Sequence, residues 1–65
     1  MNSYDFERKF KIVLKANKDV EIFLNDMTLI IADKYKFNSI GTRIKLWHKS
    51  VYIGETWLES ICCVW

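Results

Sequence analysis

Hydrophobic and polar residues alternate with a period of two along much of the chain. In residues 10–15 and 20–25 apolar side chains occupy the even positions, so that each segment has one continuous apolar face. Alternation of this kind predicts strands that bury one face in a core. Residues 16–19 between them are polar and include Asn and Asp, which favour turns. Residues 10–25 are therefore predicted to form a β-hairpin.

The rest of the chain carries further segments of strand character. A turn at residues 25–26 leads into a β-branched run, and a basic–aromatic segment continues this run after a bend. Gly41 lies in the next turn, where it is free to adopt a positive φ. Residues 54–59 break the period and contain a weak capping-box pattern, which predicts one helical turn. The predicted strands are residues 27–31, 34–37, 42–48, 50–53 and 61–65.

The N-terminal residues fit two structures. Residues 5–10 match one amphipathic helical turn capped by Ser3. They also match a strand whose one face carries Tyr4, Phe6, Arg8 and Phe10. The strand is favoured because the residues that follow carry the same even phase. The helix stays open as the alternative.

Short connections between these segments predict a single all-β domain that spans residues 1–65. The predicted architecture is an antiparallel meander of five or six strands, with at most one or two short helical turns. Such a meander curls into a small, partly open barrel, or it leaves an edge with which another chain pairs. The predicted core comprises Ile12, Leu14, Ile22, Leu24, Leu29, Ile31, Ile44, Leu46 and Ile53.

Composition shows that this core is small. The chain has 65 residues, of which 51% are hydrophobic and 15% aromatic, and its net charge is +2. At this size the gain from burying apolar surface nearly cancels the entropy lost on ordering the chain. A disulfide between the neighbours Cys62 and Cys63 would close no loop of useful length, so it would not stabilise the fold. What remains is a well-packed aromatic core or self-association, and the sequence favours a homo-oligomer.

Neither a membrane span nor a secretory signal is predicted. No apolar run approaches the roughly 20 residues of a membrane-crossing helix. The charged residues between Met1 and Lys11 leave no apolar stretch of a signal peptide. The free thiols are typical of a reducing compartment. The sequence thus predicts a cytoplasmic protein without a membrane partner.

The order of the predicted elements resembles that of an Sm-like barrel. The likeness rests on a charged strand, the Tyr-containing strand of residues 51–53, one helical turn, and a closing strand that begins at Ile61. It spans residues 10–65, but an Asn-Gly turn expected of that family is missing where Asn17 and Lys18 stand. The resemblance implies a small barrel that binds nucleic acid as a dimer or ring. The chain also resembles, in its length and its Lys, Asn and Ile content, short β-rich proteins of phages of Gram-positive bacteria.

Catalysis is not predicted. His48 is the only imidazole, no acidic residue lies near it in the sequence, and a turn separates it from Ser50. A general base needs an orienting partner and a pocket, so His48 is interpreted as a turn residue at a strand end. The carboxylates are dispersed, and two neighbouring thiols with one imidazole cannot complete a four-ligand zinc site. No cofactor, metal ion or catalytic residue is therefore predicted.

The middle of the chain carries the candidate binding surface. Between Lys34 and Lys49 basic and aromatic residues are interspersed, and no acidic residue occurs. Cations of this kind meet phosphates, and aromatic rings stack on unpaired bases. A Trp beside an Arg is equally a signature of protein-binding hot spots. The predicted binding residues are Lys34, Tyr35, Lys36, Phe37, Arg43, Lys45, Trp47 and Lys49.

Three interpretations of this surface stay open: a solvated face whose lysine stems shield Trp47, a protein-docking surface, and a nucleic-acid-binding surface. The net charge of +2 favours protein over nucleic acid, because it supports little non-specific phosphate affinity. The favoured function is that of a small non-catalytic binding protein, encoded by a phage or mobile element, which docks onto a host protein. An inhibitor of a nucleic-acid-processing or defence enzyme is one form of it. The alternative is direct binding of single-stranded nucleic acid as a dimer or ring.

Overall fold

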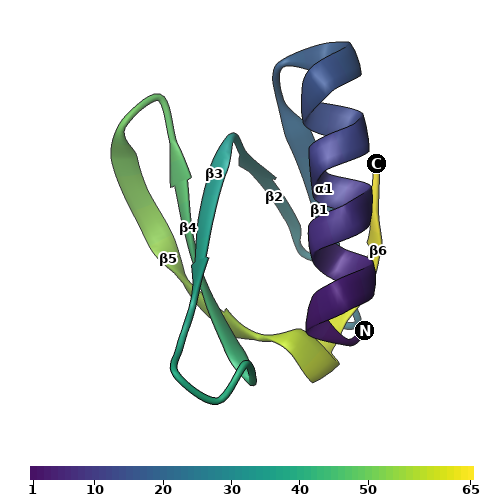
Figure 1. Cartoon of the computed structure of the whole chain (residues 1–65), viewed down its shortest axis with the longest axis vertical. Coiled ribbons are helices and arrows are strands. Elements are labelled where there is room, and N and C mark those ends of the chain that lie inside the picture. The colour runs from purple at the N-terminus through teal and green to yellow at the C-terminus, as the bar shows by residue number, and fades with distance from the viewer.

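The computed structural model describes all 65 residues and shows one helix beside two small sheets (Figure 1). The helix lies against the sheet that contains the first and the last strand, and the other sheet lies to one side and contacts the helix through side chains of β3. In chain order the elements are α1 (Ser3–Asn17), β1 (Val20–Leu24), β2 (Leu29–Ala32), β3 (Lys34–Phe37), β4 (Arg43–His48), β5 (Val51–Trp57), the 3-10 helix η1 (Leu58–Ser60) and β6 (Ile61–Val64).

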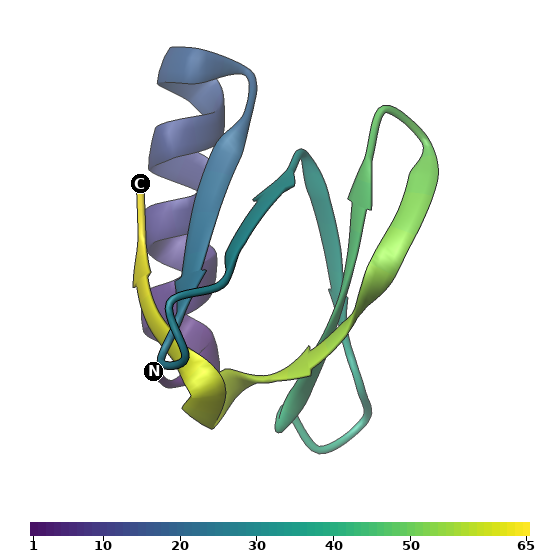
Figure 2. The same cartoon turned by 180° about the vertical axis from the view of Figure 1, so that it is seen from behind.

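The strands form two antiparallel three-stranded sheets. The first sheet has the order β2-β1-β6, and the second sheet has the order β3-β4-β5. Only Asp33 separates β2 from β3, and the chain bends there from one sheet into the other (Figure 2). Helix η1 makes the second connection, from β5 to β6. A bulge after Leu46 shifts the pairing of β4 with β5, and this shift decides which side chains of the second sheet are neighbours.

Helix α1 forms because its large apolar residues recur at helical spacing. Phe6, Phe10 and Val13 lie on one face and are buried, as the 3.6-residue period requires. Asn2 caps the first turn, where its side-chain oxygen accepts a hydrogen bond from the Asp5 N–H at 2.8 Å. The negative charge of Asp5 also suits the N-terminal end of the helix dipole. Capping and core packing thus both favour the helix here.

Helix α1 corrects the prediction of strands in residues 3–15 and with it the hairpin. The even-phase alternation placed Ile12 in the core, but this side chain is 57% exposed on α1. The segment fits both periods, since Phe10 and Val13 belong to the buried helical face while Phe10, Ile12 and Leu14 mimic a strand. Short apolar runs leave this ambiguity in a sequence. The limit of one or two short helical turns is therefore wrong.

The core lies between α1 and the inner faces of the two sheets. Phe6 and Phe10 are fully buried, and the rings of Tyr35 and Phe37 pack against them from β3. The ring centres of Phe10 and Tyr35 are 4.7 Å apart in an edge-on arrangement, which aromatic pairs prefer. The buried side chains are Phe6, Phe10, Val13, Val20, Ile22, Ala32, Ile44, Leu46, Leu58, Ile61 and Val64.

The predicted core is confirmed in β1 and β4 and is wrong in β2 and β5. Ile22, Ile44 and Leu46 are buried, while β2 turns Ala32 inward and leaves Ile31 exposed. A phase error of one residue moves the apolar set of a strand to the opposite face. Leu14 and Leu24 are half-buried against the core. The predicted core residues that the structure leaves exposed are Ile12, Leu29, Ile31 and Ile53.

The antiparallel, mostly β character of the chain is confirmed. Strand β3 has the predicted bounds of residues 34–37, and the predicted helical turn is present as the short η1. Strand β5 runs on through residues 54–57, where a break was predicted, and the strands fall into two sheets. No helix has both the length and the apolar character that crossing a bilayer requires.

Candidate binding surface

The second sheet has one face against the core and one face open to solvent. In β4 the side chains of Ile44 and Leu46 point into the core, so the odd-numbered residues of this strand point outward. Pairing with β3 and β5 extends this open side across all three strands. We name it the outer face, and its side chains are Lys34, Lys36, Arg43, Lys45, Trp47, Tyr52, Glu55 and Trp57.

One end of the outer face is a row of one cation and two aromatic rings. Lys34 pairs with Trp47 across β3 and β4, and Trp47 pairs with Tyr52 across β4 and β5. The Lys34 Nζ lies 5.6 Å from the centre of the Trp47 ring, a cation–π contact. The rings of Trp47 and Tyr52 meet edge-on with centres 5.5 Å apart. Trp47 is thus half-buried by its neighbours, and Tyr52, which is 51% exposed, is the accessible ring.

The other end of the outer face is built around Arg43. Its guanidinium carbon lies 4.4 Å from the centre of the Trp57 ring, and its Nη1 donates to the Glu55 Oε1 at 3.3 Å. A planar guanidinium suits both contacts, because it stacks on a ring while its edge donates to a carboxylate. Trp57 remains 46% exposed. This end therefore offers a large apolar surface that is held in place by a charged neighbour.

The middle of the outer face carries two unneutralised cations. Lys36 pairs directly with Lys45 across β3 and β4, and both are exposed. Neither lysine forms an ion pair: Lys45 faces Glu55 across β4 and β5, but the Glu55 carboxylate is engaged by Arg43. Like charges placed directly opposite each other on a sheet are destabilising. An acidic partner molecule would relieve this repulsion.

Three of the predicted binding residues lie elsewhere, which corrects the sequence-based surface. Tyr35 and Phe37 are half-buried on the inner side of β3, where they pack on Phe6. Strand alternation places them opposite to Lys34 and Lys36. Lys49 lies in the turn after β4 with φ +51°, so it stands at the end of the sheet and not on the outer face.

Tyr35 has a structural partner on α1. Its hydroxyl donates a hydrogen bond to the Glu7 Oε1 at 2.6 Å. Burial, together with this hydrogen bond, raises the pKa of Tyr35 above its ordinary value. The same hydrogen bond is the main cause that lowers the pKa of Glu7, and the charge of Lys11 adds to it. The pair therefore ties β3 to the helix, and Tyr35 is not free to contact a partner.

Sequence reasoning missed the contribution of β5 to this surface. Glu55 and Trp57 join the outer face from a segment whose pattern predicts a break, and Tyr52 joins it from the predicted strand of residues 50–53. Strand β5 is an edge strand with few buried positions, so its alternation of apolar residues is weak. The signal that pointed to it was the high number of Trp residues, which are too many for a core of this size.

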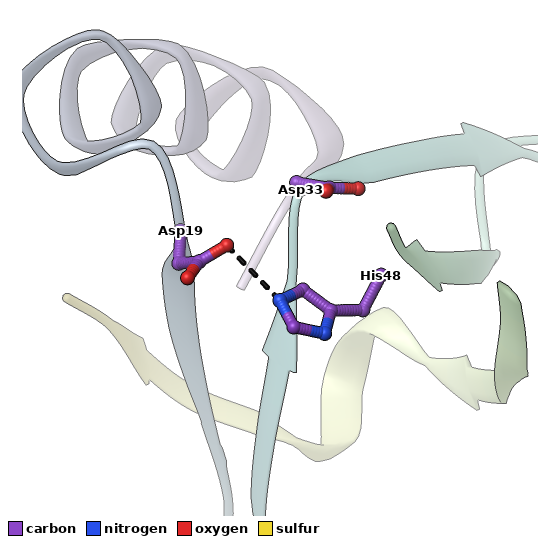
Figure 3. A group of neighbouring side chains, drawn as sticks. All are labelled: Asp19, Asp33 and His48. Carbon is purple, nitrogen blue, oxygen red and sulfur yellow. Dashed lines mark hydrogen bonds and ion pairs between the residues drawn. The ribbon is translucent and has the colours of Figure 1, made fainter. Parts of the chain in front are cut away.

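A second group of polar side chains meets where the two sheets join (Figure 3). Asp19, Asp33 and His48 come from separate segments, and the nearest donor atoms of the three lie within 4.8 Å of one another. The His48 Nε2 and the Asp19 Oδ1 are 3.1 Å apart. The sequence predicts dispersed carboxylates and a His48 without an acidic neighbour. The structure corrects both expectations, because the fold brings Asp19 and Asp33 close to His48. We name this group the seam cluster.

The C-terminal thiols differ in their surroundings. Cys62 is exposed and Cys63 is half-buried. Hydrogen bonding with Cys63 raises the pKa of the Cys62 thiol, which works against formation of the nucleophilic thiolate. The Trp65 Nε1–H donates to the Cys63 Sγ at 3.1 Å, and Lys9 lies over the Trp65 ring. These contacts hold the chain end against α1.

The outer face is broad and is not hollowed at its centre. The hollows in the molecular surface lie beside α1, near Trp65 and around η1, and none of them is lined by Lys36, Lys45 or Trp47. Sites for small molecules are concave and enclose most of the ligand. The shape of the outer face therefore suits the surface of a macromolecule.

A comparison of the chain with protein-family models, with curated proteins and with solved structures finds no match. The geometry of the outer face and of the seam cluster is thus what supports a function.

Proposed function

We propose that this protein is a small, non-catalytic binding protein that docks onto a protein partner through the outer face. The observation that carries the proposal is the arrangement of Arg43 and Trp57 beside Glu55, with Tyr52 at the other end of the same face. Trp, Tyr and Arg are the residue types that dominate binding energy in protein interfaces. Each is partly exposed here, and contacts within the sheet already restrict Arg43 and Trp57.

Preorganisation supports a protein partner over other occupants. Fixing a long side chain in an interface costs about 0.5–1.5 kcal/mol when the side chain is free beforehand. Arg43 is held between the Trp57 ring and the Glu55 carboxylate before any partner binds. Lys34 is similarly placed over Trp47. Both cations are thereby engaged with rings and are less available to follow a flexible phosphate backbone.

The charge of the outer face specifies the partner further. Glu55 is its single acidic residue, and its cations are Lys34, Lys36, Arg43 and Lys45. Complementary potentials steer association and suppress wrong partners. We therefore propose a partner surface with an apolar centre and acidic residues around it. A host protein bound by a phage-encoded or mobile-element-encoded inhibitor in the cytoplasm fits this proposal, and a nucleic-acid-processing or defence enzyme is one such target.

The test compares purified baits that differ in one surface. Wild-type protein, Trp57→Ala and the double variant Arg43→Ser/Lys45→Ser are immobilised and exposed to a lysate of a Gram-positive bacterium. Tyr4→Ala is the matched control, because Tyr4 is an aromatic residue that is 72% exposed on α1, away from the outer face. Proteins enriched by wild type are identified by mass spectrometry, and the purified partner is then titrated by calorimetry.

The proposal expects a partner that wild type and Tyr4→Ala retain and that both outer-face variants lose. Trp57→Ala is expected to cost about 2 kcal/mol or more of binding free energy. Its melting temperature is expected to stay within a few degrees of the wild type, because exposed positions contribute little to folding. A partner that binds all four baits equally would contradict the proposal.

Single-stranded nucleic acid is the second candidate, and the cross-strand pair of Lys36 and Lys45 is the observation that favours it. Two cations beside accessible Tyr and Trp rings match a surface that follows phosphates and stacks bases. A fluorescent oligothymidine titrated at several salt concentrations tests it. Lys36→Ser/Lys45→Ser should then reduce the salt slope by about one unit for each lost phosphate contact. Lys15→Ser, which removes an exposed cation from α1, serves as the control.

We further propose that the two sheets act as one curled, partly open barrel in the Sm-like manner. The Asp33 N–H donates to the Trp47 carbonyl oxygen at 2.9 Å, so the β3–β4 pairing extends to the bend. The Tyr52-containing β5, the one-turn η1 and the closing β6 that starts at Ile61 follow in the expected order. Strands β5 and β6 keep unpaired edges, which supports a homo-oligomer.

A further inference from the structure

The seam cluster combines three side chains that no local sequence pattern connects. Asp19 lies between α1 and β1, Asp33 occupies the bend between β2 and β3, and His48 ends β4. Figure 3 shows the His48 ring directed at Asp19, with Asp33 on the neighbouring segment. We propose that the seam cluster is a binding site for a single divalent transition-metal ion, with Zn²⁺ as the expected ion, which links the two sheets and the end of α1.

The spacing of the donor atoms supports coordination. Metal–ligand bonds of about 2.1 Å in a tetrahedral arrangement place neighbouring donor atoms roughly 3.4 Å apart. The His48 Nε2 and the Asp19 Oδ1 are 3.1 Å apart, and the third donor, from Asp33, completes a set within 4.8 Å. Closing the site on one ion requires the Asp33 carboxylate to move closer to the other two donors. The Lys49 N–H donates to the Asp33 Oδ2 at 2.9 Å, which orients this carboxylate from outside.

The charge around the seam cluster also points to a cation. The only side chain that pairs with Asp19 is His48, and Asp33 has no basic side chain within ion-pair distance. The chain has 10 Lys and Arg residues against 8 Asp and Glu, yet no lysine or arginine neutralises these two carboxylates. Metal binding at His48 would replace the hydrogen bond of its Nε2 to Asp19, because a ligating imidazole nitrogen carries no proton. A bound dication would balance both carboxylates.

The donor types select the class of metal. Ca²⁺ takes six to eight oxygen ligands, which three side chains with one imidazole do not supply, and Mg²⁺ is suited by oxygen donors and not by imidazole. Imidazole with carboxylates suits Zn²⁺ and related transition ions. Three protein ligands leave a fourth position for water or for a donor group of a partner. The site is separate from the outer face, so it does not depend on the proposed function.

The position of the seam cluster gives a bound ion a structural role. The two sheets are joined by the bend at Asp33 and by η1, which lie at different places along the chain. An ion held by Asp19, Asp33 and His48 would add a third link between the first sheet, the second sheet and the helix end. Small domains with little core gain much from such a link.

The experiment uses the full chain with Cys62→Ser/Cys63→Ser as the background, because the two thiols are themselves zinc ligands. ZnCl₂ is titrated by calorimetry into this metal-free protein, and melting temperatures are measured with and without Zn²⁺. Asp19→Asn, Asp33→Asn and His48→Gln each remove a ligand while they keep a similar shape. Glu59→Gln is the matched control, since Glu59 is an exposed acidic residue on η1 outside the seam cluster.

The proposal expects one Zn²⁺ per chain, about tenfold or greater weakening in each of the three ligand variants, and no change in Glu59→Gln. With free Zn²⁺ at 100 times the dissociation constant, the melting temperature should rise by about 10 °C or more. His48 is the only histidine, so its ring resonances in an NMR spectrum report its coordination directly, even where a variant folds poorly. Zn²⁺ binding that all three variants retain, or unchanged His48 resonances at saturating Zn²⁺, would overturn the proposal.

Discussion

At the scale of single residues, the Tyr35 hydroxyl is the one polar group of the aromatic cluster under β3. It donates to Glu7 at 2.6 Å, and this bond is the main cause of the lowered pKa of Glu7. A carboxylate with a lowered pKa adds stability above its unfolded pKa, and that stability is lost as the pH falls through the folded pKa. The Tyr35–Glu7 hydrogen bond therefore stabilises the fold at neutral pH, and this stabilisation is lost in acid.

Tyr35→Phe tests this pair. We expect its melting temperature at pH 7 to lie a few degrees below that of the wild type, because the hydrogen bond is lost while the ring packing stays. The difference should shrink as the pH falls below 4.5, the ordinary pKa of Glu7. Tyr52→Phe is the control, since the Tyr52 hydroxyl is exposed on the outer face. Thermal melts at a series of pH values measure both, and a gap that is equal at pH 7 and pH 3 would contradict this account.

At the scale of elements, the turn between β4 and β5 is strained. Lys49 and Ser50 form a two-residue connection, and both have positive φ, at +51° and +68°. Two-residue hairpin turns of this kind favour Asn-Gly, because other residues meet a steric cost in the left-handed region. The double change Lys49→Asn/Ser50→Gly should therefore stabilise the fold by about 1 kcal/mol.

A rise in melting temperature of roughly 5 °C is the expected readout for a domain of this size. The Lys49 N–H that orients Asp33 is a backbone group and is kept in the variant. Ser39→Gly in the β3–β4 loop, at the other end of β4, is the control, because Ser39 does not have a positive φ. A turn variant that melts with or below the wild type would show that this conformation is not strained.

Helix α1 provides a second test at the same scale. Phe10 is 1% exposed and Ile12 is 57% exposed, although strand alternation had placed both on one buried face. Phe10→Ala should cost about 3–5 kcal/mol, the usual range for a buried aromatic. Ile12→Ala should change stability by less than about 0.5 kcal/mol. Urea titrations followed by circular dichroism compare the two, and equal losses would restore the strand interpretation.

The two periods of residues 6–14 explain which parts of the fold were predictable. In β4 the alternation was unambiguous, and Ile44 and Leu46 are buried as expected. Phe10, Ile12 and Leu14 show the same alternation by coincidence, while Phe6 and Phe10 carry the helical spacing that packing selects. In β2 the sequence likewise did not determine which alternate residues face the core, because Leu29, Ile30 and Ile31 are all apolar. The local pattern of apolar residues predicts a helix or a strand only where the helical period or the strand period fits, and not both.

At the scale of the whole molecule, the outer face was partly predictable from local sequence pattern and the seam cluster was not. The outward residues of β4 were predictable because one strand contains them all. The contact of Arg43 with Trp57 depends on the register of β4 against β5, and the neighbours of Trp47 depend on the bulge after Leu46. The seam cluster was beyond prediction, since Asp19 and His48 are 29 residues apart and meet only through the packing of the two sheets.

The unpaired edges of the two sheets bear on whether the chain acts alone or associates with a second copy. Strands β2, β3, β5 and β6 each have one edge without a partner strand, and only β3 among them contains lysine, a residue that commonly protects edges. Along β5 the side chains of Val51, Tyr52 and Ile53 are exposed. A second copy of the chain would pair these backbone groups and bury these side chains. We therefore expect reversible self-association.

Sedimentation velocity at low and high micromolar concentration measures this association, together with melting temperatures that should rise with concentration. Ile53→Lys places a charge on the β5 edge and is expected to shift the protein to monomers with an unchanged circular dichroism spectrum. Ile40→Lys adds the same charge in the β3–β4 loop, where Ile40 is 76% exposed, and should leave the assembly intact. A wild-type monomer at every concentration, with a constant melting temperature, would show that the edges stay unpaired. The outer face would then have to meet its partner as a single three-stranded sheet.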